Sequence, residues 1–200
     1  MKMSCLPVSL FGDICSGKME LVDWAREAKD MGYDGIDISI MFLKNRTPTY
    51  LAALKRQLNE IGMPIIMMTT YPDFTHPDSV QREREMLYLK ADVALASELG
   101  IRYLRILAGQ AHADVSREDC IKWVSDAFHE IDEYGKKFGV GLLFENHGKP
   151  GAWDKVTLHL IHRTSWRYAA ASGIRTFGST STRAILPLTV RIRGTFCRRS

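Results

Sequence analysis

The chain has 200 residues, 46% hydrophobic and 25% charged, which is the composition of an ordinary globular domain. No run approaches the roughly 18 consecutive apolar residues of a membrane helix, and Pro7 interrupts the N-terminus before a secretory signal develops, so we expect a cytoplasmic protein without membrane partners. The four cysteines (Cys5, Cys15, Cys120 and Cys197) form no C-x-x-C pair, which predicts free thiols and argues against a disulfide framework or a zinc ribbon.

The net charge of +4 is unevenly distributed along the chain. Residues 1–154 contain all 23 acidic residues and have a net charge of −5, whereas residues 155–200 contain none and have +9. We interpret 1–154 as one folded region and 155–200 as an irregular basic tail, disordered or produced by a shifted reading frame. A genuine basic tail and a folded nucleic-acid module are the alternatives. Because its arginines are scattered and aromatic residues do not alternate with them, we do not expect nucleic acid as a partner.

Before Asp154, apolar runs that predict strands alternate with amphipathic stretches that predict helices. The predicted strands are 6–12, 35–42, 63–71, 103–109 and 141–148. The predicted helices are 19–31, 50–61, 78–99 and 116–138, with glycines after several of them and Ser116 as an N-cap. Strict alternation of this kind indicates parallel strands joined by right-handed crossovers.

Two parallel α/β architectures fit this order. A doubly wound sheet usually carries a glycine-rich phosphate loop after its first strand, but residues 11–18 have neither G-x-G-x-x-G nor P-loop spacing. A (β/α)₈ TIM barrel is therefore favoured, although a complete one needs about 250 residues. We predict an incomplete barrel, the first five β/α units. Polar residues at the predicted carboxyl ends of its strands are Gly12-Asp13, Thr69-Thr70-Tyr71, Gly109-Gln110 and Glu145-Asn146-His147.

The fifth predicted strand carries the most chemical information. Side chains alternate along a strand, so Glu145 and His147 share one face. A carboxylate inside a parallel sheet is costly unless it meets a cation or hydrogen-bond donors, and a metal ion is one such cation. The alternative is that Glu145 pairs with Arg105 of the neighbouring strand. For His147 the alternative is a surface histidine near a loop.

Three segments carry a resemblance to a known family: Gly32-Tyr33-Asp34-Gly35-Ile36-Asp37-Ile38, Leu104-Arg105-Ile106-Leu107-Ala108-Gly109 and Leu143-Phe144-Glu145-Asn146-His147-Gly148. In order and spacing they resemble the second, fourth and fifth strands of the sugar isomerase/epimerase (xylose isomerase-like) superfamily. The resemblance implies that Glu145 is a catalytic carboxylate and a ligand of a divalent metal. It also implies that His147 and Arg105 bind the substrate.

The resemblance further implies the chemistry of an intramolecular isomerase. The reaction proceeds either by removal of a proton next to the carbonyl or by a hydride shift. A divalent ion (Mn²⁺, Mg²⁺ or Co²⁺) polarises two oxygens of a sugar or sugar phosphate, and in the first route a carboxylate moves the proton. The family's other metal ligands, on strands six to eight, have no counterpart after Asp154. We therefore expect the intact parent to be an enzyme, and this chain to be inactive and to hold no metal tightly.

Two other functions are alternatives. An endonuclease IV-like zinc enzyme acting on abasic DNA needs histidines at successive strand ends, whereas His76 and His112 lie in loops beyond the third and fourth predicted strands. The second alternative is a non-catalytic scaffold fragment, whose exposed strand edges pair between copies of the chain to give a homo-oligomer.

Overall fold

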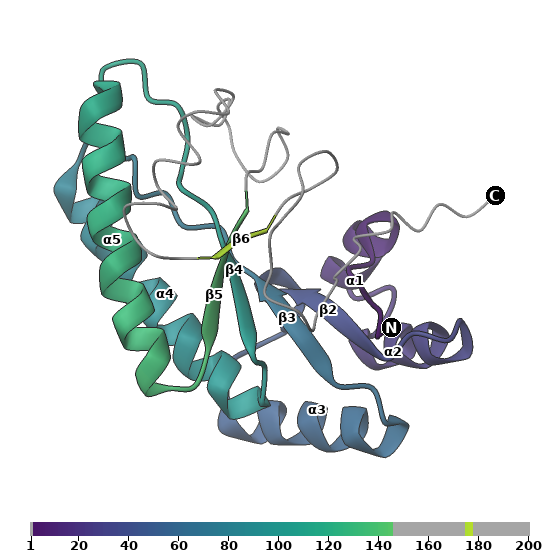
Figure 1. The fold of residues 1–200 in the computed structure, drawn as a ribbon. Helices are drawn as coiled ribbons and strands as arrows, with labels where there is room; N and C mark the ends of the chain where they lie inside the picture. The colour runs from purple at the N-terminus through teal and green to yellow at the C-terminus, as the bar shows by residue number, and fades with distance from the viewer. Residues whose placement is uncertain (1, 146–174, 178–200) are drawn as a thin grey trace. The chain divides into compact units, whose positions relative to one another are not determined.

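A computed structural model describes residues 2–145 and 175–177, and these fall into two compact units (Figure 1). The first unit contains residues 2–69 and 95–102, and the second contains 70–94, 103–145 and 175–177. Each unit has parallel strands with helices between them. No helix among these residues has the length and apolar character that crossing a membrane requires.

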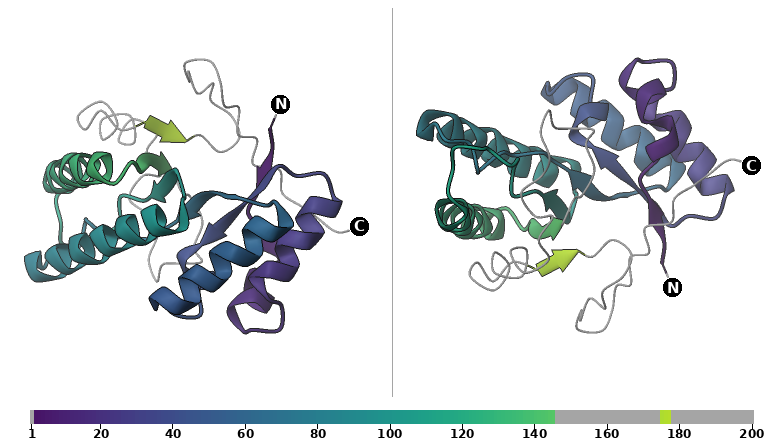
Figure 2. Two further views of the ribbon diagram at one scale, coloured as in Figure 1. Left: turned by 90° about the horizontal axis from the view of Figure 1, so that it is seen from below. Right: turned by 90° about the horizontal axis from the view of Figure 1, so that it is seen from above.

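The first unit is built on three parallel strands in the order β1, β2, β3. They are β1 (Ser4–Cys5), β2 (Gly35–Ser39) and β3 (Ile65–Thr69). Its helices α2 (Leu21–Asp30) and α3 (Pro48–Ile61) lie side by side (Figure 2), and Lys29 Nζ donates to the Ile61 carbonyl at 2.5 Å. Helix α3 ends where the sequence predicts, because Gly62 adopts the left-handed conformation at φ 78°.

The position of the first predicted strand is wrong. The strand is β1, and residues 8–15 are helical instead, as a 3₁₀ turn η1 (Val8–Leu10) followed by α1 (Phe11–Cys15). The chain turns at Pro7, whose carbonyl accepts from Leu10 N, and this turn folds the apolar run back on itself. Asp13, expected at a strand end, therefore lies in α1 and is exposed.

The second unit has three parallel strands in the order β4, β5, β6. They are β4 (Tyr103–Ile106), β5 (Gly141–Glu145) and β6 (Arg175–Phe177). Helix α4 (Ser79–Leu99) begins in this unit and lies beside α5 (Arg117–Lys137), to which Lys90 Nζ and Glu130 Oε1 link it at 2.6 Å (Figure 2). Ser116 caps α5 as predicted, since its Oγ accepts from Asp119 N at 3.1 Å.

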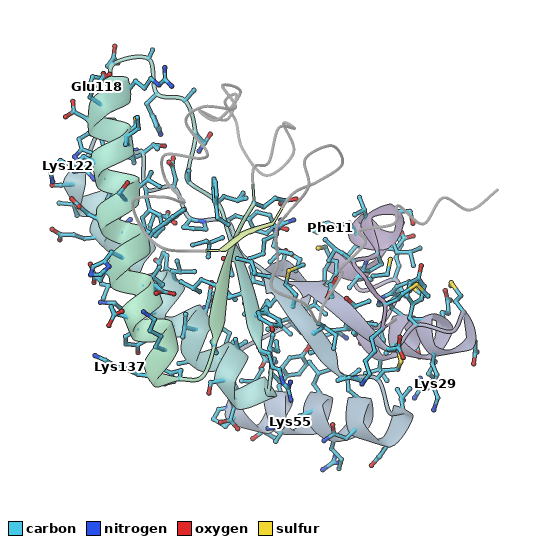
Figure 3. The ribbon with its side chains drawn as sticks, in the orientation of Figure 1. Phe11, Lys29, Lys55, Glu118, Lys122 and Lys137 are labelled. Carbon is cyan, nitrogen blue, oxygen red and sulfur yellow. The ribbon has the colours of Figure 1, made fainter. Side chains whose placement is uncertain are left out.

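Helix α5 has the two faces that its sequence predicts. Its inner face buries Phe128, whose ring lies 6.3 Å from that of Phe74 and 5.3 Å from that of Phe144 in β5. Burying a phenylalanine in this way contributes about 2–3 kcal/mol. Glu118 and Lys122 project from the opposite face (Figure 3). The helix therefore fixes which face of β5 is turned toward it.

Strand β6 lies within the residues predicted to form an irregular tail. It pairs parallel with β5, in a register that places Leu143 opposite Arg175 and Glu145 opposite Phe177. The rest of that prediction, for 155–174 and 178–200, falls outside the described residues.

Candidate functional site

The packing of Phe144 decides where Glu145 points. Phe144 is buried against Phe128 of α5, so its side chain lies on the helix-facing side of β5. Since successive side chains of a strand point to opposite faces, Glu145 lies on the other side. In a (β/α)₈ barrel that side is the interior, and the carboxyl ends of the strands are where active sites form.

Arg105 lies on the same face as Glu145 and forms an ion pair with it. Arg105 is opposite Leu143 in the parallel register of β4 and β5, two residues before Glu145. Its Nη1 is 2.5 Å from Glu145 Oε2, and the two side chains are only 8% and 9% exposed. The structure therefore shows Arg105, the alternative to a metal ion, as the partner of Glu145. A buried pair of this kind balances its charges locally, and breaking it by removing one partner typically costs 3–5 kcal/mol.

The segment after β3 holds Arg105 in place. Thr70 donates to the carbonyl of Arg105 from both its backbone N, at 2.9 Å, and its Oγ1, at 3.0 Å. The ring of Tyr71 lies 5.9 Å from the guanidinium carbon of Arg105, within cation–π range. The polar strand end predicted at residues 69–71 therefore adjoins the Arg105–Glu145 pair.

A second polar cluster surrounds Asp73, which is 6% exposed. Its Oδ1 accepts from Thr75 N at 3.2 Å, Thr75 Oγ1 at 2.7 Å and Gln110 N at 3.1 Å. Its Oδ2 accepts from Gln110 Nε2 at 3.2 Å and lies 2.9 Å from His112 Nε2. One buried carboxylate thus joins the loop after β3 to the loop after β4. We call Asp73, Thr75, Gln110 and His112 the Asp73 cluster.

Three titratable groups border the Asp73 cluster. The His76 ring packs against that of His112 with centroids 5.1 Å apart. Glu85 Oε2 of α4 accepts from Asp73 N at 3.4 Å, and burial raises the pKa of this carboxyl. Burial also raises the pKa of the Cys120 thiol to about 11, with Asp119 and Asp73 adding to the effect. Cys120 is therefore an unreactive thiol, and Cys5, Cys15 and Cys120 form no disulfide within the described part of the chain; Cys197 lies outside it.

Glu85→Gln is expected to stabilise the protein at pH 7 by about 0.3–0.5 kcal/mol, a small gain because Glu85 is half-exposed and screened by solvent. Burial raises the folded-state pKa above 4.5, so the folded protein binds this proton more tightly and ionisation opposes folding at higher pH. The gain should disappear below about pH 4.5, where both states are protonated. Urea unfolding at pH 4 and pH 7 measures it. The exposed Glu83→Gln serves as control, and an equal pH-dependent gain there would contradict the assignment.

The structure therefore brings together two of the three predicted site residues, Arg105 and Glu145. His147 lies outside the described residues. Neither Asp73 nor its contact with His112 was predicted from the sequence. The position of Asp73, two residues beyond the polar end of the third predicted strand, was a signal that could have pointed to it. Its partner His112 lies 39 residues further along the chain, and no spacing in the sequence indicates that contact.

A comparison with protein families identifies the fold. The model of the family described as the xylose isomerase-like TIM barrel matches residues 25–164. The chain belongs to this family. The predicted (β/α)₈ fold class, represented by its first five β/α units, is confirmed, and the match runs ten residues past Asp154. No curated protein matches the sequence significantly.

Solved structures of this TIM-barrel fold agree with the assignment. 3-Keto-D-glucoside 4-epimerase YcjR from E. coli superimposes with a TM-score of 0.67 at 16% identity, over 88% of this chain and 67% of that one. D-psicose 3-epimerase, solved with D-fructose, gives a TM-score of 0.70 at 11% identity, over 88% and 62%. The IOLI protein with a bound zinc atom gives 0.67 at 16% identity, over 86% and 59%. At these identities the likeness concerns the fold, and the chain spans about three-fifths to two-thirds of each structure.

The zinc atom in one structure of this TIM-barrel fold raises the question of whether the residues here fit a metal. Within 2–145 no group of three or more His, Cys, Asp or Glu side chains is arranged to hold one. Glu145, the predicted ligand, is paired through Oε2 with Arg105, and Asp73 accepts from donors on both of its oxygens. His76 and His112 do lie together, but with Asp73 they form no metal-ligating group in this part of the chain. The described residues of this xylose isomerase-like chain therefore do not fit a metal by themselves.

Proposed function

We propose that the complete barrel to which these residues belong is a sugar isomerase or epimerase whose catalytic carboxylate is Glu145. The observation that supports this most is the buried Arg105–Glu145 pair on the barrel-interior face, at the carboxyl end of β5. An ionised pair in the interior of a barrel costs desolvation that apolar residues would avoid. A role in binding and proton transfer accounts for its presence there.

The chemistry of the pair suits a ketose or aldose. One route between such sugars removes a proton from the carbon next to the carbonyl, which places negative charge on the carbonyl oxygen, and this is the route that we propose. A carboxylate such as Glu145 accepts that proton, and the guanidinium of Arg105 stabilises the oxygen charge. Arg105 Nε is buried and has no hydrogen-bond partner among the described residues, so it has a donor to offer a sugar oxygen. His147 is proposed as a further substrate-binding residue.

Neutral sugars are the substrate class that we propose first, with sugar phosphates as the related alternative. Two structures of the same fold support this choice. One is named as a 3-keto-D-glucoside 4-epimerase, and the other is D-psicose 3-epimerase, solved with D-fructose. The metal role implied for Glu145 is a separate matter, because it requires the carboxylate to leave Arg105. We also propose that this chain alone turns over little or no sugar, since it spans 62% of D-psicose 3-epimerase and a closed barrel takes eight strands.

The test joins residues 1–154 to strands six to eight of a related epimerase and measures deuterium incorporation at carbon 3 of D-fructose in D₂O by NMR. The chimera should exchange this proton, and Glu145→Gln should reduce the rate by 10²-fold or more, roughly the contribution of a general base. Arg105→Lys keeps the charge but not the planar donor set, and should reduce the rate less. The unmodified chain should exchange no faster than buffer. A chimera that folds cooperatively yet exchanges equally well with Glu145→Gln would contradict the proposal.

A further inference from the structure

We propose that Arg105 takes the place of a metal ion at Glu145 in this chain, so that the carboxylate is neutralised by a protein cation. The inference deepens the proposed function at the same residues. Its test measures metal binding and stability instead of turnover, so either proposal can fail without the other.

The guanidinium of Arg105 lies where a metal ion bound to Glu145 would lie. Arg105 Nη1 lies 2.5 Å from Glu145 Oε2. A divalent ion bound to the same oxygen would sit about 2.0–2.6 Å from it. Nη1 therefore occupies the space beside Oε2 that a coordinated ion would need. A divalent ion there would also face the positive charge of Arg105 inside the protein, where the two cations repel strongly.

The buried guanidinium of Arg105 cannot easily move away from Glu145. The Arg105 side chain is 8% exposed, and the ring of Tyr71 lies 5.9 Å from its guanidinium carbon. Within the described part of the chain, Glu145 is the carboxylate that balances its charge. Moving Glu145 onto a metal would leave a buried guanidinium uncompensated, which is among the costliest changes a protein interior can undergo.

Residues 2–145 supply too few ligands for a metal ion at Glu145. A metal competes with Arg105 only if several groups bind it together, and the residues 2–145 assemble no group of three. Asp73, the nearest buried carboxylate along the loop after β3, already accepts from Thr75, Gln110 and His112. Among residues 2–145 the pair is therefore favoured over a metal on geometry, charge and ligand count together.

The experiment uses the full 200-residue chain, freed of metal with a chelator. MnCl₂ at about 1 mM should leave the thermal midpoint of the wild type unchanged to within about 1 °C. Equimolar protein should leave the free Mn²⁺ signal in electron paramagnetic resonance undiminished. Arg105→Met and Glu145→Leu should each lower the midpoint by roughly 10 °C, because each leaves one buried charge alone. The double variant should recover more than half of the summed loss.

The exposed Arg102→Met is the matched control, and it should change the midpoint by less than about 2 °C. Stabilisation of the wild type by Mn²⁺ that Glu145→Gln removes would overturn the proposal. So would a double variant whose loss equals the sum of the two single losses. If either single variant fails to fold, the Mn²⁺ resonance measurement on the wild type decides alone: loss of the free-ion signal overturns the proposal, and its persistence supports it.

Discussion

Asp73→Ala is expected to lower the free energy of unfolding by roughly 3–5 kcal/mol. The carboxylate is 6% exposed and accepts hydrogen bonds from Thr75 and Gln110 and contacts His112. Removing it leaves several buried donors without acceptors, and each unsatisfied group costs about 1–3 kcal/mol before water or relaxation compensates. Urea unfolding followed by circular dichroism measures the loss.

Two variants separate this effect from a general sensitivity of the loops. Asp114→Ala removes an exposed carboxylate from the loop after β4 and should change stability by less than about 0.5 kcal/mol. Asp73→Asn keeps the size of the side chain and one acceptor oxygen, so its loss should fall between the two. If Asp73→Ala and Asp114→Ala were equally stable, the Asp73 cluster would not be the link between the loops after β3 and β4.

Gly109→Ala is expected to cost roughly 3 kcal/mol or more, although it adds a single methyl group. A Cβ at this position would lie 2.3 Å from both Asp73 Oδ1 and Thr75 Oγ1, far inside van der Waals contact. The backbone φ of 138° is also one that residues with a side chain rarely adopt. The substitution therefore strains the backbone and forces the Asp73 cluster apart. Amide hydrogen exchange should show the loss of protection at residues 73–75 and 110.

Gly139→Ala is the matched control for the backbone contribution. Gly139 has a φ of 69°, and a Cβ there would have no neighbour within 4 Å. Its cost should be only the strain of a left-handed alanine, about 1–2 kcal/mol. A cost for Gly109→Ala no larger than that for Gly139→Ala would mean that Asp73 and Thr75 move aside without penalty.

Arg105 and Glu145 form only one part of the site that a complete barrel of this family would hold. The pair shows how one part of a xylose isomerase-like barrel presents charge at its strand ends. Strands six to eight of a complete barrel supply the rest of such a site. The described residues contribute β6 as one further parallel strand beside β5.

The sequence by itself determined the alternation of strands and helices and the ends of the four predicted helices to within two residues, whereas β2, β3 and β4 end two or three residues earlier than predicted. The N-cap at Ser116 and the helix stop at Gly62 were predictable because both act on backbone groups within a few residues. The two-residue period of strands also predicted that Phe144 and Glu145 point to opposite faces of β5.

Only the tertiary structure decided where the first strand lies and which partners the buried charges take. The apolar run after Pro7 suits a strand or a helical turn equally well, and pairing of Ser4 and Cys5 with β2 settles the choice. The contacts of Asp73 with Gln110 and His112 span 37 and 39 residues. Such contacts depend on strand register and on the path of the loops. Local signals in the sequence, such as hydrophobic periodicity and capping residues, predict neither of these. For the same reason the sequence left a metal and Arg105 as competing cations for Glu145, and the register of β4 beside β5 places Arg105 there.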